Sequence, residues 1–151
     1  ARPAADIIKG QLEKQPPMVK EMAFPILDSL ENGQTVDEVN PMLQSLFRPS
    51  VQPYLISWFA YDPREEITKL EQPGLIIQGT NDLQVPTEEA QLLAEAGGEN
   101  TQILLLENMN HVFKETEAVD IAGQMSVYLN PELPLIPGLV PAITAFIFAI
   151  P

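Results

Sequence analysis

The sequence predicts an α/β fold with a helical region over residues 1–70, then a parallel β–α–β unit and terminal helices. The prediction rests on two short continuous apolar runs, residues 75–78 and 103–106, with a helical pattern between them. A strand, a helix and a strand within about 30 residues form a parallel β–α–β unit, whose strands are usually buried on both faces. The composition changes near residue 70, so residues 71–151 form the part that carries the strands.

The first 70 residues carry helical signals throughout. Apolar residues recur at the spacing of one helix face, at Val19, Met22, Ala23, Ile26, Leu27 and Leu30. Pro25 falls inside this pattern, so we expect a kink or a break there. Thr35 and Glu38 fit a capping box that opens a second short helix, with Pro41 near its start. Residues 50–59 indicate a third helical segment.

Two further helices begin with capping signals. Asp62 and Pro63 supply an N-cap and a first-turn proline, which predict a helix of one or two turns over residues 64–70. Thr87 opens the helix between the two strands. The glycine pair at 97–98 ends that helix, because glycine readily adopts the left-handed conformation of a helix C-cap.

The segment after the second strand predicts two more helices. Residues 119–128 form the first, and a proline-rich loop follows over residues 131–141. The last helix runs to about residue 150 and is apolar on all sides. A helix that is apolar all round is expected to be buried.

Composition and charge exclude several classes of function. With 8 basic and 21 acidic residues the net charge is −13, whereas a nucleic-acid binder requires a basic face. Anionic membrane surfaces are disfavoured for the same reason, and the longest apolar run, residues 139–150, is shorter than the roughly 18 residues of a membrane span. Without cysteine and with one histidine, the chain has no disulfide, thiol nucleophile or histidine-rich metal site. No cofactor is predicted. The N-terminus lacks the apolar segment of a signal peptide, and the compartment is not predicted.

Two segments carry a family resemblance. LIIQGTNDLQVP, residues 75–86, and LLLENMNHVF, residues 104–113, resemble the C-terminal part of the α/β-hydrolase superfamily. The resemblance is clearest over residues 73–114 and is closest to the serine aminopeptidase and lysophospholipase-like esterase branch. It implies that Asp82 is the acid and His111 the base of a catalytic triad. It also implies that the preceding helical region is a cap, or lid, and that residues 71–151 are the C-terminal part of the core.

Physical reasoning about the two residues agrees with this resemblance. Each follows a predicted strand, and the carboxyl ends of parallel strands lie along one edge, where ligands bind. A buried carboxylate can hold an imidazole with its Nε2 facing a nucleophile. Taken singly, Asp82 can be a turn former and His111 a structural residue; their order and the intervening helix favour the pair. We interpret Asn81 and Asn110 as turn residues and Glu107 as a rival acid that points elsewhere.

The nucleophile expected from the resemblance is missing. The family carries its serine in G-x-S-x-G, ahead of the acid. The chain has no such motif, and its serines are Ser29, Ser45, Ser50, Ser57 and Ser126. We therefore expect this chain to be part of a larger hydrolase whose N-terminal half is missing from the sequence. The chain could be a cloned or proteolytic fragment, a protein whose N-terminal half was not resolved, or a remnant that forms homo-oligomers. The resemblance implies an ester or related acyl substrate and an acyl-serine intermediate. The chain alone is expected to be inactive.

Two points stay open. Met42, Leu43, Trp58 and Phe59 are candidates to line the acyl pocket under the lid, with ordinary core packing as the alternative. The alternative function is a non-catalytic interaction or dimerisation module built on the same half-fold. Ester, thioester, amide and lactone substrates are not distinguished.

Overall fold

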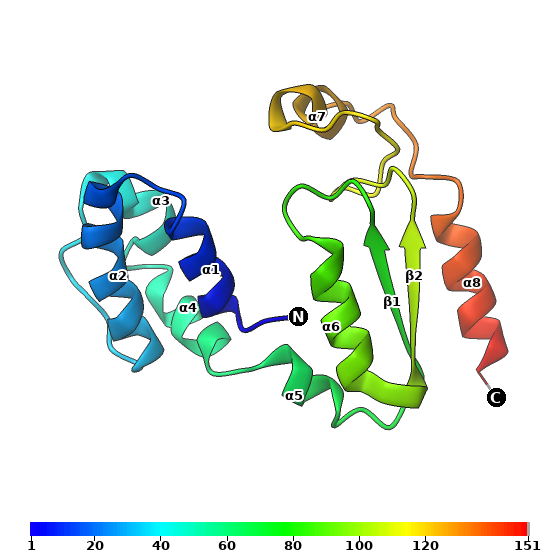
Figure 1. Ribbon diagram of the computed structural model, residues 1–151, viewed down its shortest axis with the longest axis horizontal. Coiled ribbons are helices and arrows are strands. Elements are labelled where there is room, and N and C mark those ends of the chain that lie inside the picture. The colour runs from blue at the N-terminus through cyan, green and yellow to red at the C-terminus, as the bar shows by residue number, and fades with distance from the viewer. Residues whose placement is uncertain (151) are drawn as a thin grey trace. The chain divides into compact units, whose positions relative to one another are not determined.

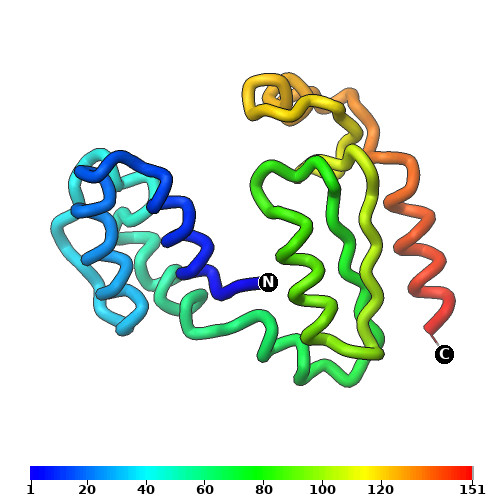
Figure 2. Tube along the Cα trace, in the orientation of Figure 1, coloured from blue at the N-terminus to red at the C-terminus, as the bar shows by residue number. Residues whose placement is uncertain are grey.

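The structure is a computed structural model that describes residues 1–150. It divides into two compact units, Arg2–Glu66 and Ile67–Pro151, the latter together with Ala1. Figures 1 and 2 show the order of the elements along the chain. The N-terminal unit contains α1 (Ala4–Leu12), α2 (Pro17–Glu31), the 3-10 helix η1 (Pro41–Leu43), α3 (Gln44–Phe47) and α4 (Gln52–Phe59). α5 (Pro63–Ile67) spans the boundary between the units.

The second unit contains the sheet. Its elements are β1 (Gly74–Gly79), α6 (Thr87–Gly97), the 3-10 helix η2 (Gly98–Asn100), β2 (Thr101–Leu106), α7 (Ile121–Tyr128) and α8 (Leu139–Ala149). The two strands pair in parallel with Gly74 opposite Thr101 and Gly79 opposite Leu106. α6 packs against both strands, as Figure 1 shows. The predicted β–α–β unit is present.

The predicted α/β class, as the C-terminal part of an α/β-hydrolase fold, is nevertheless wrong for this chain. About half of the residues, 51%, are helical, and the sheet has only two strands. The larger buried cluster lies in the N-terminal helices, with Leu27, Leu30 and Phe47 fully buried. The prediction gave too much weight to two apolar runs. Two six-residue strands cannot enclose a core between covering layers, so most buried apolar area comes from helix packing.

The N-terminal unit differs from expectation at two places. α2 continues through Pro25 without a break, because the apolar face on both sides of the proline packs into one cluster. No helix begins at Thr35; the next helical residue is Pro41, and Asn40 caps it by accepting a hydrogen bond from Met42 N at 3.0 Å. Asn40 directly precedes a first-turn proline, a stronger helix start than the Thr35 capping box.

Gln52 is a buried polar anchor of the N-terminal unit. Its side-chain amide accepts from Val36 N at 2.7 Å and donates to Val36 O and Phe47 O, both at 2.8 Å. The two bonds to Val36 satisfy backbone groups of a loop that has no regular structure of its own. Gln52 therefore holds the 35–40 loop onto the helical core.

The C-terminal elements are less buried than expected. Ile103 and Leu105 of β2 are each 40% exposed, so the strand is not covered on both faces. In α8, Leu139 is buried but Phe148 is 84% exposed. The unit's own buried cluster is small, formed by Met109, Ile136 and Leu139. Within residues 1–150, no helix has the length and apolar character needed to cross a membrane.

Candidate active site

Gly79 ends β1 where the backbone of the loop after β2 comes very close. A Cβ built on Gly79 would lie 2.0 Å from Met109 O, far inside van der Waals contact. Glycine leaves room for this approach. Two residues on, Asn81 N donates a hydrogen bond to Met109 O at 3.1 Å. The turn that carries Asp82 is therefore bonded directly to the turn that follows β2.

Asn110 shapes the turn that carries His111. Its buried side-chain oxygen accepts hydrogen bonds from Val112 N at 3.1 Å and Lys114 N at 3.0 Å. Phe113 completes the turn in the left-handed region, with φ of 61°. The predicted turn role of Asn110 is confirmed, and His111 is presented to the surface with its side chain 41% exposed.

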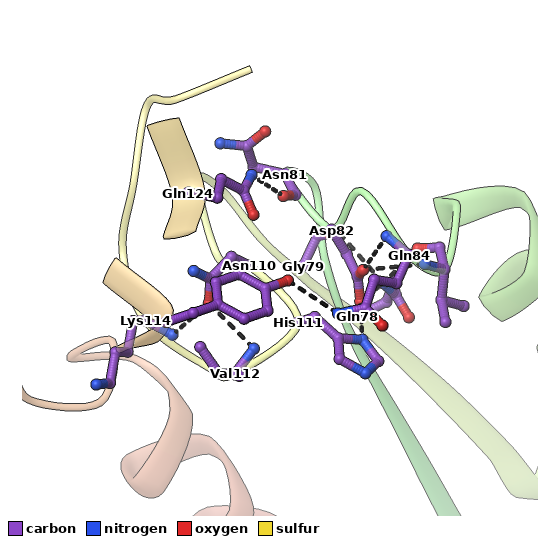
Figure 3. Close-up of polar contacts among 12 residues, drawn as sticks. Gln78, Gly79, Asn81, Asp82, Gln84, Asn110, His111, Val112, Lys114 and Gln124 are labelled. Carbon is purple, nitrogen blue, oxygen red and sulfur yellow. Dashed lines mark hydrogen bonds and ion pairs between the residues drawn. The ribbon is translucent and has the colours of Figure 1, made fainter. Parts of the chain in front are cut away.

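Gln124 of α7 ties the first turn to a helix. Its Nε2 donates to Asn81 O at 2.9 Å, as Figure 3 shows, and to Ala118 O, also at 2.9 Å. Asn81 in turn donates from its side-chain amide to Thr116 O at 2.6 Å and Ala118 O at 3.0 Å. These bonds brace the Asp82 turn from the side of α7.

His111 and Asp82 meet at this edge of the sheet. His111 Nδ1 lies 3.0 Å from Asp82 Oδ2, and Figure 3 shows the contact. The Asp82 side chain is only 8% exposed, so the acid is buried behind the imidazole. The two residues named from the sequence therefore lie in hydrogen-bonding contact. Their catalytic role stays a prediction.

The Asp82 carboxylate is well supplied with donors. Its Oδ1 accepts from Gln84 N at 2.8 Å and Val85 N at 2.9 Å, and its Oδ2 accepts from Gln78 Nε2 at 3.1 Å. Burial raises the pKa of Asp82, but the bonds from Val85, His111, Gln84 and Gln78 together outweigh it. The pKa of Asp82 lies below its usual range, so the group is an anion at neutral pH.

A hollow of about 170 Å³ adjoins the residues that follow Asp82. It is lined by Leu83, Gln84, Ile121, Gln124, Met125 and Tyr128. Leu83, Ile121 and Met125 are its apolar side chains. Two other lining residues are joined by a hydrogen bond from Gln84 Nε2 to Tyr128 Oη at 3.2 Å. A space of this size holds roughly five or six water molecules at about 30 Å³ each. It would accommodate a short apolar group.

The four residues predicted to line an acyl pocket have mixed positions in the N-terminal unit. Leu43 is buried in the helical core, and Phe59 packs against that core. Met42 is 60% and Trp58 is 49% exposed. Met42 and Leu43 line a hollow of about 210 Å³ with residues of α1. Their role as a substrate pocket stays a prediction.

Within residues 1–150, the structure shows no serine of the second unit acting as a nucleophile beside Asp82 and His111. Ser29, Ser57 and Ser126 donate to carbonyls three or four residues earlier in their own helices. Ser126 is the one serine in the unit that carries His111, and its hydroxyl donates to Gly123 O instead of to His111. Glu107, the rival acid, is exposed just after β2. The described residues therefore supply an acid and an imidazole without an attached nucleophile.

Sequence reasoning missed Gln78 and Gln124. Both are uncharged residues inside regular elements, where glutamine is usually a solvated surface residue. For Gln78 a signal existed: a polar residue interrupts the apolar run of β1 one position before Gly79. Gln124 had no comparable signal.

Two further findings concern a possible metal site and the similarity of the chain to known proteins. The part of the chain that the structure describes has no cluster of three or more His, Asp or Glu side chains that could hold a metal ion. Comparison with protein-family models, curated proteins and solved structures gave no match for this chain.

Proposed function

We propose that Asp82 and His111 are the acid and base of a serine-hydrolase triad, in a protein related to the α/β-hydrolase superfamily. The observation that carries the proposal is the 3.0 Å contact between His111 Nδ1 and a buried, ionised Asp82. A carboxylate in this position orients the imidazole and stabilises the imidazolium that forms during acyl transfer. The nucleophilic serine comes from sequence other than residues 1–151.

In the proposed reaction His111 acts twice. Its Nε2 takes the proton of the serine hydroxyl as the oxygen attacks the substrate carbonyl, and it then gives that proton to the departing alcohol. Water hydrolyses the acyl-serine by the same steps. Asp82 stays ionised throughout and keeps Nδ1 hydrogen-bonded. No metal or cofactor takes part in this scheme.

The hollow beside Asp82 supports a small acyl or alcohol group as part of the substrate. Its volume of about 170 Å³ matches a chain of a few carbon atoms better than a long fatty acid. Leu83 and Met125 give it apolar walls. A short-chain carboxylic ester is therefore the proposed substrate class. In the same proposal the N-terminal helices are the lid.

The test is ester hydrolysis by the full-length product of the gene that encodes this chain. We expect cleavage of p-nitrophenyl butyrate, and His111→Ala should lower kcat/KM roughly 10³-fold or more because triad members act as a unit. Glu107→Gln is the matched control, since this exposed acid lies four residues before His111 and its substitution should leave the rate unchanged. An unchanged rate in His111→Ala would reject the assignment. Inhibitor-sensitive activity from the 151-residue chain alone would show that a nucleophile lies within it.

A second candidate function is a homo-oligomerisation module, which one observation favours. Phe148, Ile147 and Val140 of α8 are 84%, 58% and 55% exposed, and such exposed apolar groups mark interaction surfaces. Light scattering after gel filtration tests this candidate on the chain itself. We expect an oligomer that Phe148→Asp dissociates, whereas Met18→Asp, at an exposed apolar position of the other unit, does not. A monomer at all concentrations would reject the candidate.

A further inference from the structure

Gln78 makes an unusual set of contacts for a strand residue. Its side-chain Nε2 lies 3.1 Å from Asp82 Oδ2 and 2.9 Å from Val85 O, and 3.4 Å from Gly79 O. Val85 O and Gly79 O are backbone carbonyl oxygens, which act only as hydrogen-bond acceptors. The same holds for Oδ2 when Asp82 is ionised. The amide group, not the side-chain oxygen, therefore faces the carboxylate.

The carboxylate of Asp82 is saturated by donors. An ionised carboxylate has about four acceptor positions. Two on Oδ1 are filled by Gln84 N and Val85 N, and one on Oδ2 is filled by Gln78. The fourth partner is His111 Nδ1 at 3.0 Å. An unprotonated Nδ1 would set two acceptors against each other at this distance, so the neutral imidazole carries its proton on Nδ1.

The position of Oδ2 depends on Gln78. The two backbone donors contact Oδ1 and make no contact with Oδ2. Gln78 is the one protein donor besides His111 that contacts Oδ2 in the described structure. Because the same amide also bonds to Val85 O, it fixes Oδ2 relative to the turn that supplies the Oδ1 donor. The oxygen that meets the imidazole is thus anchored from β1.

We propose that Gln78 is a positioning residue, which orients Asp82 Oδ2 toward His111 and thereby selects the Nδ1–H tautomer. This inference rests on the proposed function for its catalytic meaning, because that tautomer leaves the Nε2 lone pair free to act as the base. Gln78 does not touch the reacting atoms. It acts through Asp82.

The experiment uses ¹⁵N NMR of the imidazole in the 151-residue chain. The chain has a single histidine, so the two ring-nitrogen signals need no assignment. In the neutral form of the ring, we expect Nδ1 to be protonated and Nε2 to be unprotonated in the wild type. Gln78→Leu keeps the volume but removes the donor, and it should move the two signals toward each other as the Nε2–H tautomer gains population.

Gln84→Leu is the matched control. Its side chain bonds to Tyr128 Oη, while its backbone N is the group that bonds to Asp82. The substitution therefore changes a neighbouring amide and leaves all donors to the carboxylate in place, so the tautomer should be unchanged. Gln78→Glu, which is nearly isosteric, adds a second carboxylate beside Asp82. It should raise the pKa of Asp82, read from its ¹³C carboxyl titration.

The outcomes separate the positioning role from the proposed function. An unchanged tautomer in both Gln78 variants rejects the positioning role, even if His111→Ala abolishes ester hydrolysis in the full-length product. If the tautomer shifts, Gln78→Leu should also lower kcat on the order of 10-fold with little change in KM, as loss of an orienting hydrogen bond does elsewhere. A shifted tautomer with unaltered kcat rejects the catalytic meaning. A merely structural Gln78 would lower Tm without moving the ring-nitrogen signals.

Discussion

Replacing Gly79 by alanine tests whether the two turns of the site are held by close backbone contact. The added Cβ would lie 2.0 Å from Met109 O and 2.6 Å from Met109 C, both backbone atoms that cannot rotate away. The turns must separate by about 1 Å or more to relieve this overlap. Separation breaks the bond from Asn81 N to Met109 O, worth about 1 kcal/mol, and overpacking adds about 1–3 kcal/mol.

We therefore expect Gly79→Ala to lower the free energy of unfolding of the second unit by about 2–4 kcal/mol. Gly74→Ala is the control at the other end of β1, where a Cβ would lie 3.7 Å from Thr101 in ordinary contact. It should change stability by less than about 1 kcal/mol. Neither glycine has a positive φ, so backbone conformation does not explain the difference.

Urea unfolding, followed through the methyl signal of the buried Met109, reads this unit directly. The signal is needed because the only tryptophan, Trp58, lies in the other unit. In Gly79→Ala the ¹⁵N signals of the His111 ring should also lose the wild-type tautomer pattern. Equal stability of Gly79→Ala and Gly74→Ala would refute the reasoning about close approach.

Three further predictions follow from single contacts. The lowered pKa of Asp82 means that its ionised form contributes stability at pH above its ordinary pKa and that this contribution is lost as pH falls through the lowered value; Asp82→Asn should flatten the dependence of the urea midpoint on pH over that range. Gln52→Leu leaves partly buried backbone groups of Val36 and the buried carbonyl of Phe47 without partners and should cost about 3 kcal/mol, measured by tryptophan fluorescence in urea. Asp120 caps α7 by accepting from Gly123 N at 2.7 Å, so Asp120→Ala should cost about 1 kcal/mol, seen as a lower thermal midpoint by circular dichroism; an unchanged midpoint would contradict the cap.

Local signals predicted the position of most elements in the second unit. The glycine pair at 97–98 ends α6 as expected, with Gly98 at φ of 61°. Polar and glycine residues at strand ends also marked the turns that carry Asp82 and His111. These signals are local because capping and turn chemistry depend on a few neighbouring residues.

Tertiary features could not be predicted in the same way. The continuity of α2 through Pro25 depends on packing of its apolar face in the helical cluster. The exposure of Phe148 on α8 depends on what lies around the helix, and an apolar sequence alone cannot supply neighbours. Gln78 is a similar case. Its contact with Asp82 needs the turn to fold back along β1, which no periodic pattern records.

The fold class failed for a related reason. Two apolar runs with a helix between them predicted a β–α–β unit, which is present. They did not predict how much sheet surrounds it, since that depends on strands pairing at the two edges. The helical content of the remaining chain then decides the class.

The central claim is that His111 activates a serine, and covalent labelling with a fluorophosphonate probe tests it most directly. In the full-length gene product we expect one serine to be labelled, with labelling abolished in His111→Ala and retained in Glu107→Gln. Mass spectrometry of the labelled peptide identifies the nucleophile. A product that is not labelled at all, or one labelled equally well after His111→Ala, would contradict the account.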